Sequence, residues 1–411
     1  MRTEAEPLRH LHFGLGPLGL GFVLPFFQPR SQASLVAVIR QSSERNYYPT
    51  LEGGGTVELR YQDGTTETYS APPIRRYDHA SPQSVLEVLD GTPPQVVSCS
   101  VGVGNLDAIY QALTVLLTKH SAFYSKHALI FLPLENKSDA GTHAISHLKA
   151  SNLPTTWVDD HVFAADAIVD RICSDEILVE NATCHVTTER YAHFRFIFPD
   201  KTRLDPIKKS LQDLQLERFL CDAPDYEIEV RKKFWVMNGL QYALAALALR
   251  HNLTYAATIG DILQEESLQH LIARLRAEIA LALYFYARSQ HRDIPFGEAQ
   301  RHVDTTWKRI AGCTKDTVHR LIKDLQYVTE DLRLIACGGR SDAHPPNFND
   351  FLEKWRQRVL EPSELLLNHV EEIQAPLYHP RISYIFLEQL AKTIASLVER
   401  LSTSPPSRVG R

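Results

Sequence analysis

The spacing of apolar residues changes along this chain of 411 residues. In the first half, short apolar runs alternate with longer amphipathic segments, a pattern that predicts β-strands separated by helices. A helix is expected at residues 106–119, and a polar hairpin, 57–61 with 67–70, is expected to turn over residues 62–64. The expected strands are residues 8–13, 34–39, 95–101, 127–132 and 165–172. Strands that alternate with helices are typical of an α/β domain with a parallel sheet.

From residue 204 to residue 401, almost every segment instead has the apolar period of a helix. A chain of this length exceeds what one hydrophobic core normally serves, so two domains are expected. We assign residues 1–204 to an α/β domain with a doubly wound sheet and residues 205–401 to an all-α domain. Residues 402–411, which are rich in Ser, Pro and Arg, are expected to form a disordered tail.

Composition narrows the range of partners. The formal net charge of −5 gives no reason to expect nucleic acid or a membrane surface as a partner. The apolar runs are too short to span a bilayer, and residues 1–7 lack the apolar core of a secretory signal. The six cysteines form no C-x-x-C pair and the 18 histidines are dispersed, which argues against a metal site and favours a reducing compartment. We therefore expect a cytoplasmic monomer or homodimer that acts on a small molecule without a metal.

The glycine-rich stretch at residues 11–21 (LHFGLGPLGLG) follows the first expected strand. Its glycines have the spacing that dinucleotide-binding, Rossmann-type domains use. The first allows a tight turn, the second lets the backbone approach a pyrophosphate, and the third lets the next helix pack close to the sheet. An ordinary glycine-rich turn is the alternative. The expected cofactor contacts here are Gly14, Gly16, Pro17, Leu18 and Gly19.

The end of the second expected strand bears on the choice of cofactor. About 20 residues beyond the glycines, NAD enzymes usually place an acidic residue on the ribose 2′-hydroxyl. This chain has Arg40 there, followed by Ser42 and Ser43. An arginine suits a 2′-phosphate, so NADP(H) is favoured and NAD(H) remains possible. The alternative is an exposed arginine, with Ser42 capping the next helix.

Other polar residues follow the expected strands at their carboxyl ends. In open parallel sheets ligands bind at these ends, so Gly102, Glu135 and Asn136 are expected to face the cofactor, and Asn136 the substrate as well. The alternative for Glu135 and Asn136 is a cap for the helix that starts near Asp139. Asp170 and Arg171 lie within a mainly apolar run, where such a pair is usually structural but also shapes sites.

An expected helix at residues 226–249 contains three polar residues on one side. Lys233, Asn238 and Gln241 fall within a sector of about 140° if the helix is a regular α-helix. A buried amide without a partner costs about 1–3 kcal/mol, so the two amides need hydrogen-bond partners. The alternative is that the amides bond neighbouring loops while Lys233 extends into solvent.

Together, five blocks of the chain resemble the polyol-specific long-chain dehydrogenases, typified by mannitol-1-phosphate 5-dehydrogenase and mannitol 2-dehydrogenase. The blocks are residues 12–22, 101–105, 134–136, 167–172 and 233–241. The catalytic signature of that family is Lys, four residues, Asn, two residues, His. This chain has Lys233 and Asn238, and Gln241 stands where the family has histidine.

A weaker match, residues 315–320 and 331–333, resembles the family's later substrate-contacting segment. The family's Arg-Lys pair in that segment corresponds to Gln326 and Tyr327 here. Arg333 and the pair Asp170 and Arg171 are the substrate contacts that the resemblance implies, with Asn136.

The resemblance implies reversible hydride transfer between a secondary alcohol of a polyol, sugar or sugar phosphate and a nicotinamide. Lys233 would be the general base, with its pKa lowered by desolvation, and Asn238 and Gln241 would donate hydrogen bonds to the reacting oxygen. Two alternatives remain: a dinucleotide-binding protein without activity on the same scaffold, and a dehydrogenase for a carbonyl substrate that is not a sugar.

Overall fold

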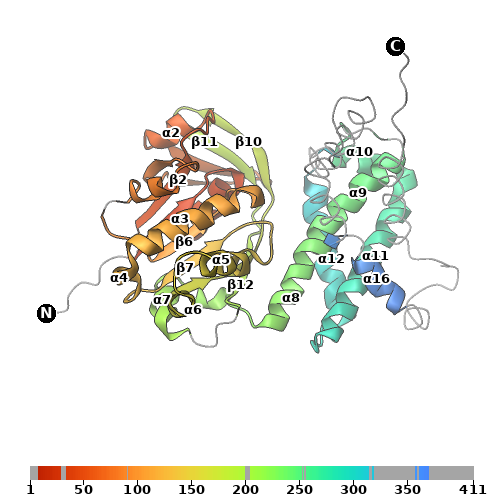
Figure 1. Cartoon of the computed structure of the whole chain (residues 1–411). Coiled ribbons are helices and arrows are strands. Elements are labelled where there is room, and N and C mark those ends of the chain that lie inside the picture. The colour runs from red at the N-terminus through yellow and green to blue at the C-terminus, as the bar shows by residue number, and fades with distance from the viewer. Residues whose placement is uncertain are drawn as a thin grey trace, which may run out of the picture. The chain divides into compact units, whose positions relative to one another are not determined.

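The computed structural model of this chain describes residues 8–28, 34–89, 91–199, 204–251, 253, 256–313, 317–318, 357–358 and 361–369. Two compact units divide the chain, residues 1–226 and 227–411 (Figure 1). The first is an α/β unit and the described part of the second is helical, so the fold class expected from the sequence is confirmed. In the described residues, no helix is long and apolar enough to span a membrane.

The first unit is built on a six-stranded sheet with the order β5-β2-β1-β6-β7-β8, in which every neighbouring pair is parallel. The strands are β1 (Arg9–Phe13), β2 (Ser34–Arg40), β5 (Ile74–Tyr77), β6 (Val96–Cys99), β7 (Leu129–Pro133) and β8 (Val162–Ala164). The order reverses at β1, because β2 lies on one side of it and β6 on the other. Ligands of doubly wound sheets bind at the carboxyl ends of the strands beside such a reversal.

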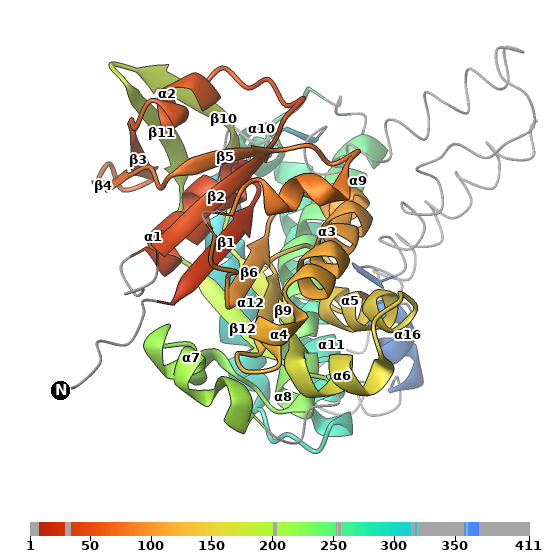
Figure 2. The same cartoon turned by 60° about the vertical axis from the view of Figure 1, so that its left-hand side comes forward.

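Helices cover both faces of this sheet. In β7, Leu129 and Phe131 point to one core, while Ile130 and Leu132 point to another, as the alternation of side chains along a strand requires. Figure 2 shows α3 and α5 on the first side and α1 and α7 on the second. These helices are α3 (Leu106–Lys119), α5 (Ala140–Lys149), α1 (Leu24–Phe27) and α7 (Lys208–Asp213). The helix expected at 106–119 therefore has the predicted bounds.

Helical character begins near residue 205, as the sequence predicts, yet the first helices after that point belong to the first unit. Ile207, Leu211 and Leu214 are buried in the same core as Phe196 of the sheet region. Apolar periodicity identifies a helix but does not say which core the helix joins. The short elements of this stretch are η4 (Asp205–Ile207), α7 and η5 (Glu217–Phe219).

Two smaller sheets extend the first unit. The expected hairpin is confirmed: β3 and β4 pair antiparallel, and Gly64 in their turn has a positive φ of 82°. The four-stranded sheet has the order β10-β11-β3-β4, and the two-stranded one pairs β12 with β9. Their bounds are β3 (Thr56–Tyr61), β4 (Thr66–Ser70), β9 (Asp166–Asp170), β10 (Cys173–Glu180), β11 (Thr183–Thr188) and β12 (His193–Ile197).

The remaining helical elements of the first unit are short connections. They are α2 (Tyr48–Glu52), η2 (Pro82–Leu86), η3 (Val103–Asn105), α4 (Ser121–Tyr124) and α6 (Thr155–His161).

In the second unit, α11 packs against α9, α12 and α16. The helix expected at residues 226–249 is present but is not a regular α-helix throughout. It runs as α8, then as a π-helical segment, η6, and then as α9. The bounds are α8 (Ala223–Arg231), η6 (Lys232–Asn238), α9 (Gly239–Arg250), α10 (Ile259–Gln264), α11 (Glu266–Ser289), α12 (Phe296–Gly312) and α16 (Glu361–Asn368).

Candidate functional site

The turn after β1 requires glycine at its first position. Gly14 has a φ of +102°, in the left-handed region, and its N–H donates to the carbonyl of Val38 on β2 at 2.9 Å. A Cβ atom on Gly14 would lie 2.5 Å from the carbonyl oxygen of Ser100. Both the backbone conformation and the contact with the loop after β6 therefore exclude any other residue.

The next two glycines of the turn differ in their surroundings. A Cβ on Gly19 would lie 2.4 Å from the carbonyl oxygen of Gly14, so the helix starts in close contact with the turn. A Cβ on Gly16 would meet nothing within 4 Å. The helix begins at Pro17, continues through Leu18, and becomes π-helical over η1 (Gly19–Val23). Its first amides have no intrahelical acceptor, and open space lies at Gly16 beside them.

Glu135 closes the loop that follows β6. Its carboxylate accepts hydrogen bonds from the N–H of Val101 at 2.5 Å and from the N–H of Gly102 at 3.1 Å. Gly102 has a φ of +86°, which turns its amide toward the carboxylate. Glu135 is buried, and this burial raises the pKa of its carboxyl to about 7, although the two amides favour the ionised form. Glu135 therefore bonds this loop rather than the helix after Asp139, and Asn136 beside it is exposed.

Arg40 lies at the end of β2, as expected, and its guanidinium donates to the side-chain carbonyl of Asn105 in η3. The amide of Asn105 in turn donates to the carbonyl of Val101 at 2.8 Å. In the described part of the chain, Arg40 makes no ion pair. Arg40, at the end of β2, and Asn105, after β6, thus connect the carboxyl ends of the two strands that flank β1. Asn105 was not expected to take part.

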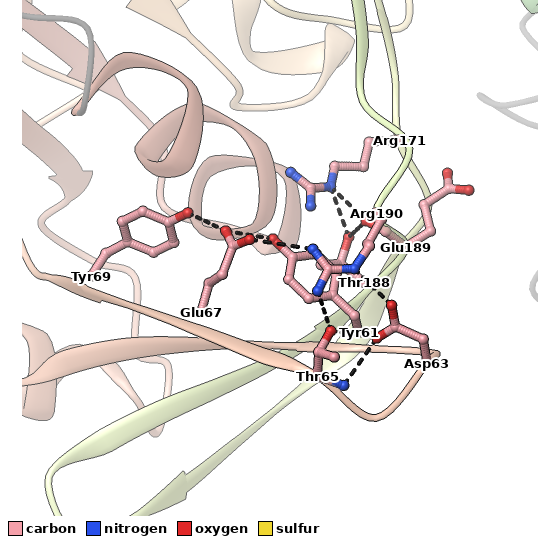
Figure 3. A network of polar contacts seen from close by, with 9 residues as sticks. All are labelled: Tyr61, Asp63, Thr65, Glu67, Tyr69, Arg171, Thr188, Glu189 and Arg190. Carbon is pink, nitrogen blue, oxygen red and sulfur yellow. Dashed lines mark hydrogen bonds and ion pairs between the residues drawn. The ribbon is translucent and has the colours of Figure 1, made fainter.

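Asp170 is the last residue of β9 and Arg171 follows it directly. Asp170 is buried, and Arg171 is half-buried. The hydrogen bonds found for Arg171 both use Nε, which donates to Thr188 Oγ1 at 3.1 Å and to the carbonyl of Glu189 at 3.0 Å. Figure 3 shows its two terminal nitrogens without a bond to the residues drawn. Arg171 is therefore anchored at Nε.

An aromatic ring joins Arg171 to the β3–β4 hairpin. The guanidinium carbons of Arg171 and Arg190 lie 5.6 Å and 4.3 Å from the centre of the Tyr61 ring (Figure 3). The hydroxyls of Tyr61 and Tyr69 both donate to Glu67, at 2.8 and 2.6 Å, and these bonds hold the pKa of Glu67 below its usual range despite partial burial. This network fixes the hairpin against the end of β9.

In the second unit, Lys233 and Asn238 lie in η6 and Gln241 lies in the first turn of α9. Five residues span about 500°, or 140° in projection, in an α-helix. A π turn instead bonds residue i to residue i+5, which places Asn238 one turn above Lys233. Gln241 follows three residues later on the same side. The three residues therefore share a narrower stripe than the sequence predicts. Asn238 is buried, and Lys233 and Gln241 are partly buried.

The same helix has a close neighbour that the sequence did not indicate. A Cβ on Gly239 would lie 2.6 Å from the carbonyl oxygen of Arg358. Arg358 is buried, its guanidinium lies 4.5 Å from the centre of the Tyr242 ring, and its Nε has no hydrogen-bond partner among the described residues. Gly239 therefore admits the backbone of Arg358 directly beside Asn238.

Arg333, Gln326 and Tyr327 lie outside the described residues. Within the described ranges, no group of three or more His, Cys, Asp or Glu side chains is placed to hold a metal ion. A cavity of about 720 Å³ lies along α5 and β8, with Lys126, Lys149 and His161 in its lining. It is three strands away from the glycine turn in the sheet order.

Comparison with known proteins identifies the family of the first unit. Residues 8–201 match the family model described as the mannitol dehydrogenase Rossmann domain. D-mandelate dehydrogenase, solved with NADH and anilino(oxo)acetate, is 10% identical with a TM-score of 0.47, covering 96% of this chain and 100% of its own. The 2-dehydropantoate 2-reductase of Methylococcus capsulatus is 12% identical with a TM-score of 0.46, covering 97% of this chain and 99% of its own.

The 2-dehydropantoate 2-reductase of Porphyromonas gingivalis is 16% identical with a TM-score of 0.41, covering 85% of this chain and 99% of its own. At these values the structural likeness carries no information on the substrate. The glycine turn, the loop after β6 and the end of β9 all lie within the matched range. Residues 8–201 of this chain therefore match the Rossmann domain of the mannitol dehydrogenase family.

Proposed function

We propose that this chain is an NAD(P)-dependent oxidoreductase. It transfers hydride, without a metal, between the cofactor and a secondary alcohol or ketone of a polyol, sugar or sugar phosphate. The observation that carries the proposal is the open space at Gly16, beside the start of a helix and between two glycines that are packed too closely for any side chain. A helix start with free amides and room above the backbone suits a pyrophosphate.

The residues present fit such a cofactor. A side chain at Gly16 would fill the space next to the first amides of the helix, whereas glycine leaves it open. Arg40 stands at the end of β2 without an acidic partner in the described residues, which supports NADP(H) over NAD(H). Gly102 lies in the adjoining loop after β6 and donates to Glu135, which follows β7. When bound, the nicotinamide accepts or supplies the hydride at its C4.

Three residues of the second unit have the chemistry that the alcohol requires. The amine of Lys233 takes the proton of the alcohol as hydride leaves, and the amide N–H of Asn238 donates a hydrogen bond to the oxygen. Gln241 donates a second one but cannot relay a proton as a histidine can. The π turn that brings Asn238 above Lys233 supports this assignment, because such turns are frequent at functional sites.

We further propose that Asn136, Asp170, Arg171 and Arg333 contact the substrate and that the protein is a cytoplasmic monomer or homodimer. The half-buried guanidinium of Arg171, anchored by Nε, supports its part in this set. A second candidate function is dinucleotide binding without catalysis. The glutamine at position 241 favours it, since the family has histidine there.

The decisive experiment combines a cofactor titration with a substrate panel. NADH and NADPH are titrated by fluorescence against the wild type, Gly16→Asp and, as a control, Gly297→Asp at the exposed start of α12. Gly16→Asp should abolish binding and the control should not, because only the first places a carboxylate against the pyrophosphate. Polyols, ketoses and their phosphates are then followed by nicotinamide absorbance. Turnover supports the enzyme, binding without turnover supports the second candidate, and unchanged binding in Gly16→Asp contradicts both.

A further inference from the structure

Four polar side chains, three of them fully buried, form a continuous chain of hydrogen bonds under the glycine turn. His10 and His12 of β1 point to the same face and bracket Ser98 of β6, whose Oγ lies 2.7 Å from His10 Nε2 and 2.8 Å from His12 Nδ1. His12 Nε2 lies 3.1 Å from Ser100 Oγ. Ser100 Oγ donates to the carbonyl oxygen of Gly14 at 3.2 Å. His10, His12 and Ser98 are each at most 1% exposed.

The final acceptor fixes the direction of every bond in this chain. A carbonyl oxygen only accepts, so the single hydroxyl proton of Ser100 is committed to Gly14. His12 Nε2 must then donate to Ser100, and in a neutral ring His12 Nδ1 must accept the proton of Ser98. Because the proton of Ser98 is then used, His10 Nε2 has to be the donor to Ser98 Oγ. Two neutral imidazoles in this chain therefore both carry their proton on Nε2.

Two further observations agree with this direction. His10 Nδ1, which the direction leaves as an acceptor, is a buried atom without a hydrogen-bond partner among the described residues. A charged His10 would need an acceptor at that atom. Burial lowers the pKa of His10 to about 3 and that of His12 to about 4, so both rings are neutral at physiological pH.

Ser100 connects this chain to both closely packed glycines of the turn. Its hydroxyl donates to the Gly14 carbonyl, and a Cβ on Gly19 would lie 3.3 Å from Ser100 Oγ. Its carbonyl is the atom that a Cβ on Gly14 would meet at 2.5 Å. The orientation of the Gly14 peptide is thus set from inside the sheet, by a hydroxyl that is itself oriented by His12.

We infer that His12 and Ser100 are positioning residues for the dinucleotide, holding the Gly14 carbonyl so that the turn from Gly14 to Gly19 is ordered before the pyrophosphate arrives. The inference rests on the proposed function, in which this turn binds the cofactor. Without the bond to Ser100, the turn has to be ordered at the moment of binding. The conformational entropy lost in that step makes the binding free energy less favourable. Neither residue touches the cofactor in this account.

The direction of the chain is tested without any ligand. In protein with ¹⁵N-labelled histidine, long-range ¹H–¹⁵N correlations at pH 7 distinguish the two neutral tautomers of each ring. We expect His10 and His12 to show a protonated Nε2 and an unprotonated Nδ1, with His12→Gln and His10→Gln used to assign the signals. A protonated Nδ1 on His12 would reverse the bond to Ser98 and overturn the inference.

The positioning role is tested by titrating NADH and NADPH into matched variants. Ser100→Ala removes the hydroxyl that bonds Gly14, and Ser98→Ala removes an equally small hydroxyl that is fully buried and does not touch the turn. Ser100→Ala should weaken binding roughly 5- to 10-fold, the value of one hydrogen bond, and Ser98→Ala less than about 2-fold. His12→Phe should weaken binding more than His12→Gln, because an amide also offers an acceptor and a donor about as far apart as the two ring nitrogens.

The outcomes separate the two proposals. If the wild type binds neither NADH nor NADPH, the proposed function fails and the positioning role fails with it, while the tautomers still report the direction of the chain. If the wild type binds and Ser100→Ala binds equally well, only the positioning role is overturned. Unfolding midpoints of all variants are measured alongside, and equal losses of affinity in Ser98→Ala and Ser100→Ala would indicate a general loss of structure and count against the inference.

Discussion

The guanidinium of Arg40, at the end of β2, donates a hydrogen bond to the side-chain oxygen of Asn105, in η3 after β6. Arg40 ends β2 and Asn105 lies in the segment that follows β6. Because β2 and β6 flank β1, the bond crosses the carboxyl end of the strand that leads into the glycine turn. Asn105 is itself held by its bond to the carbonyl of Val101 at 2.8 Å. The position of the Arg40 charge is therefore fixed by the protein.

Replacing Arg40 with Asp should weaken NADPH binding and spare or improve NADH binding. A charge-assisted hydrogen bond to a phosphate is worth roughly 1.5–3 kcal/mol, or about 10- to 150-fold in affinity, and a carboxylate at the same place repels the phosphate. The measurement is a fluorescence titration of both reduced cofactors. Arg45→Asp, the same change of charge at an exposed arginine five residues on, is the control and should alter neither affinity. A wild type that prefers NADH would contradict the assignment.

Glu135 should make stability depend on pH with an unusual sign. Burial raises the pKa of its carboxyl from 4.5 to about 7, so the folded protein holds this proton more tightly than the unfolded chain. The free energy of unfolding therefore falls as pH rises from about 4.5 to about 7, by about 3 kcal/mol from this group. Glu135→Gln removes the titration. We expect the stability of the variant, relative to wild type, to be higher at pH 8 than at pH 5 by about that amount in urea unfolding.

The same comparison at an exposed carboxyl, Glu87→Gln, should give a difference that does not change with pH. If the difference in unfolding free energy between Glu135→Gln and wild type is the same at pH 5 and pH 8, the carboxyl of Glu135 stays ionised in its hydrogen bonds with the N–H groups of Val101 and Gly102.

The two buried histidines contribute with the opposite sign. Their folded pKa values, about 3 for His10 and about 4 for His12, lie below the unfolded value of 6.5, so the unfolded chain takes up protons first. Their contribution is present above pH 6.5 and is lost as pH falls toward 4. Each group accounts for about 2 kcal/mol between pH 6.5 and pH 5. His10→Leu should reduce the fall in the free energy of unfolding between pH 6.5 and pH 5 by about 2 kcal/mol. His127→Leu, at an exposed histidine, should leave this fall unchanged.

Local patterns predicted the parts of the site that local geometry determines. The turn at Gly14 and the helix at residues 106–119 follow from backbone conformation and apolar period, which act over a few residues. The hydrogen bond from Gly102 to Glu135 joins residues 33 positions apart in the sequence, and the bond from Arg40 to Asn105 joins residues 65 positions apart. Such pairs depend on which strands are neighbours, and the apolar period of each strand does not state that.

Two other features could not be predicted from the sequence, for a different reason. His12 lies in a strand whose side chains alternate between two covered faces, so a buried histidine looks the same in the sequence as one that faces solvent. The π turn over η6 adds one residue to a helical turn, but the apolar run around it tolerates either period. The spacing of Lys233 and Asn238 therefore indicated a broad sector, where the structure has a narrow stripe.

Lys233 should be needed for turnover and not for cofactor binding. Removing a general base costs about 10²-fold or more in rate, so Lys233→Ala should lower kcat by at least that factor on whichever substrate the panel identifies, with NADH and NADPH affinities nearly unchanged. Lys232→Ala is the matched control, because Lys232 precedes it in the same π segment and pairs with Glu229 at 2.9 Å. Full activity in Lys233→Ala would place the base elsewhere.

Restoring histidine at Gln241 separates an enzyme of altered specificity from a protein that only binds the dinucleotide. Gln241 lies three residues beyond Asn238 in the first turn of α9, on the same side of the helix. A histidine there adds a group that titrates near pH ~6.5 to the stripe formed by Lys233 and Asn238. In an enzyme, Gln241→His should therefore introduce a new inflection near that pH in the profile of kcat/KM, measured with the substrate and cofactor that the wild type uses. Gln241→Asn, which keeps an amide and adds no titrating group, should leave the shape of the profile unchanged. An identical profile in the wild type and both variants would place position 241 away from the reacting oxygen.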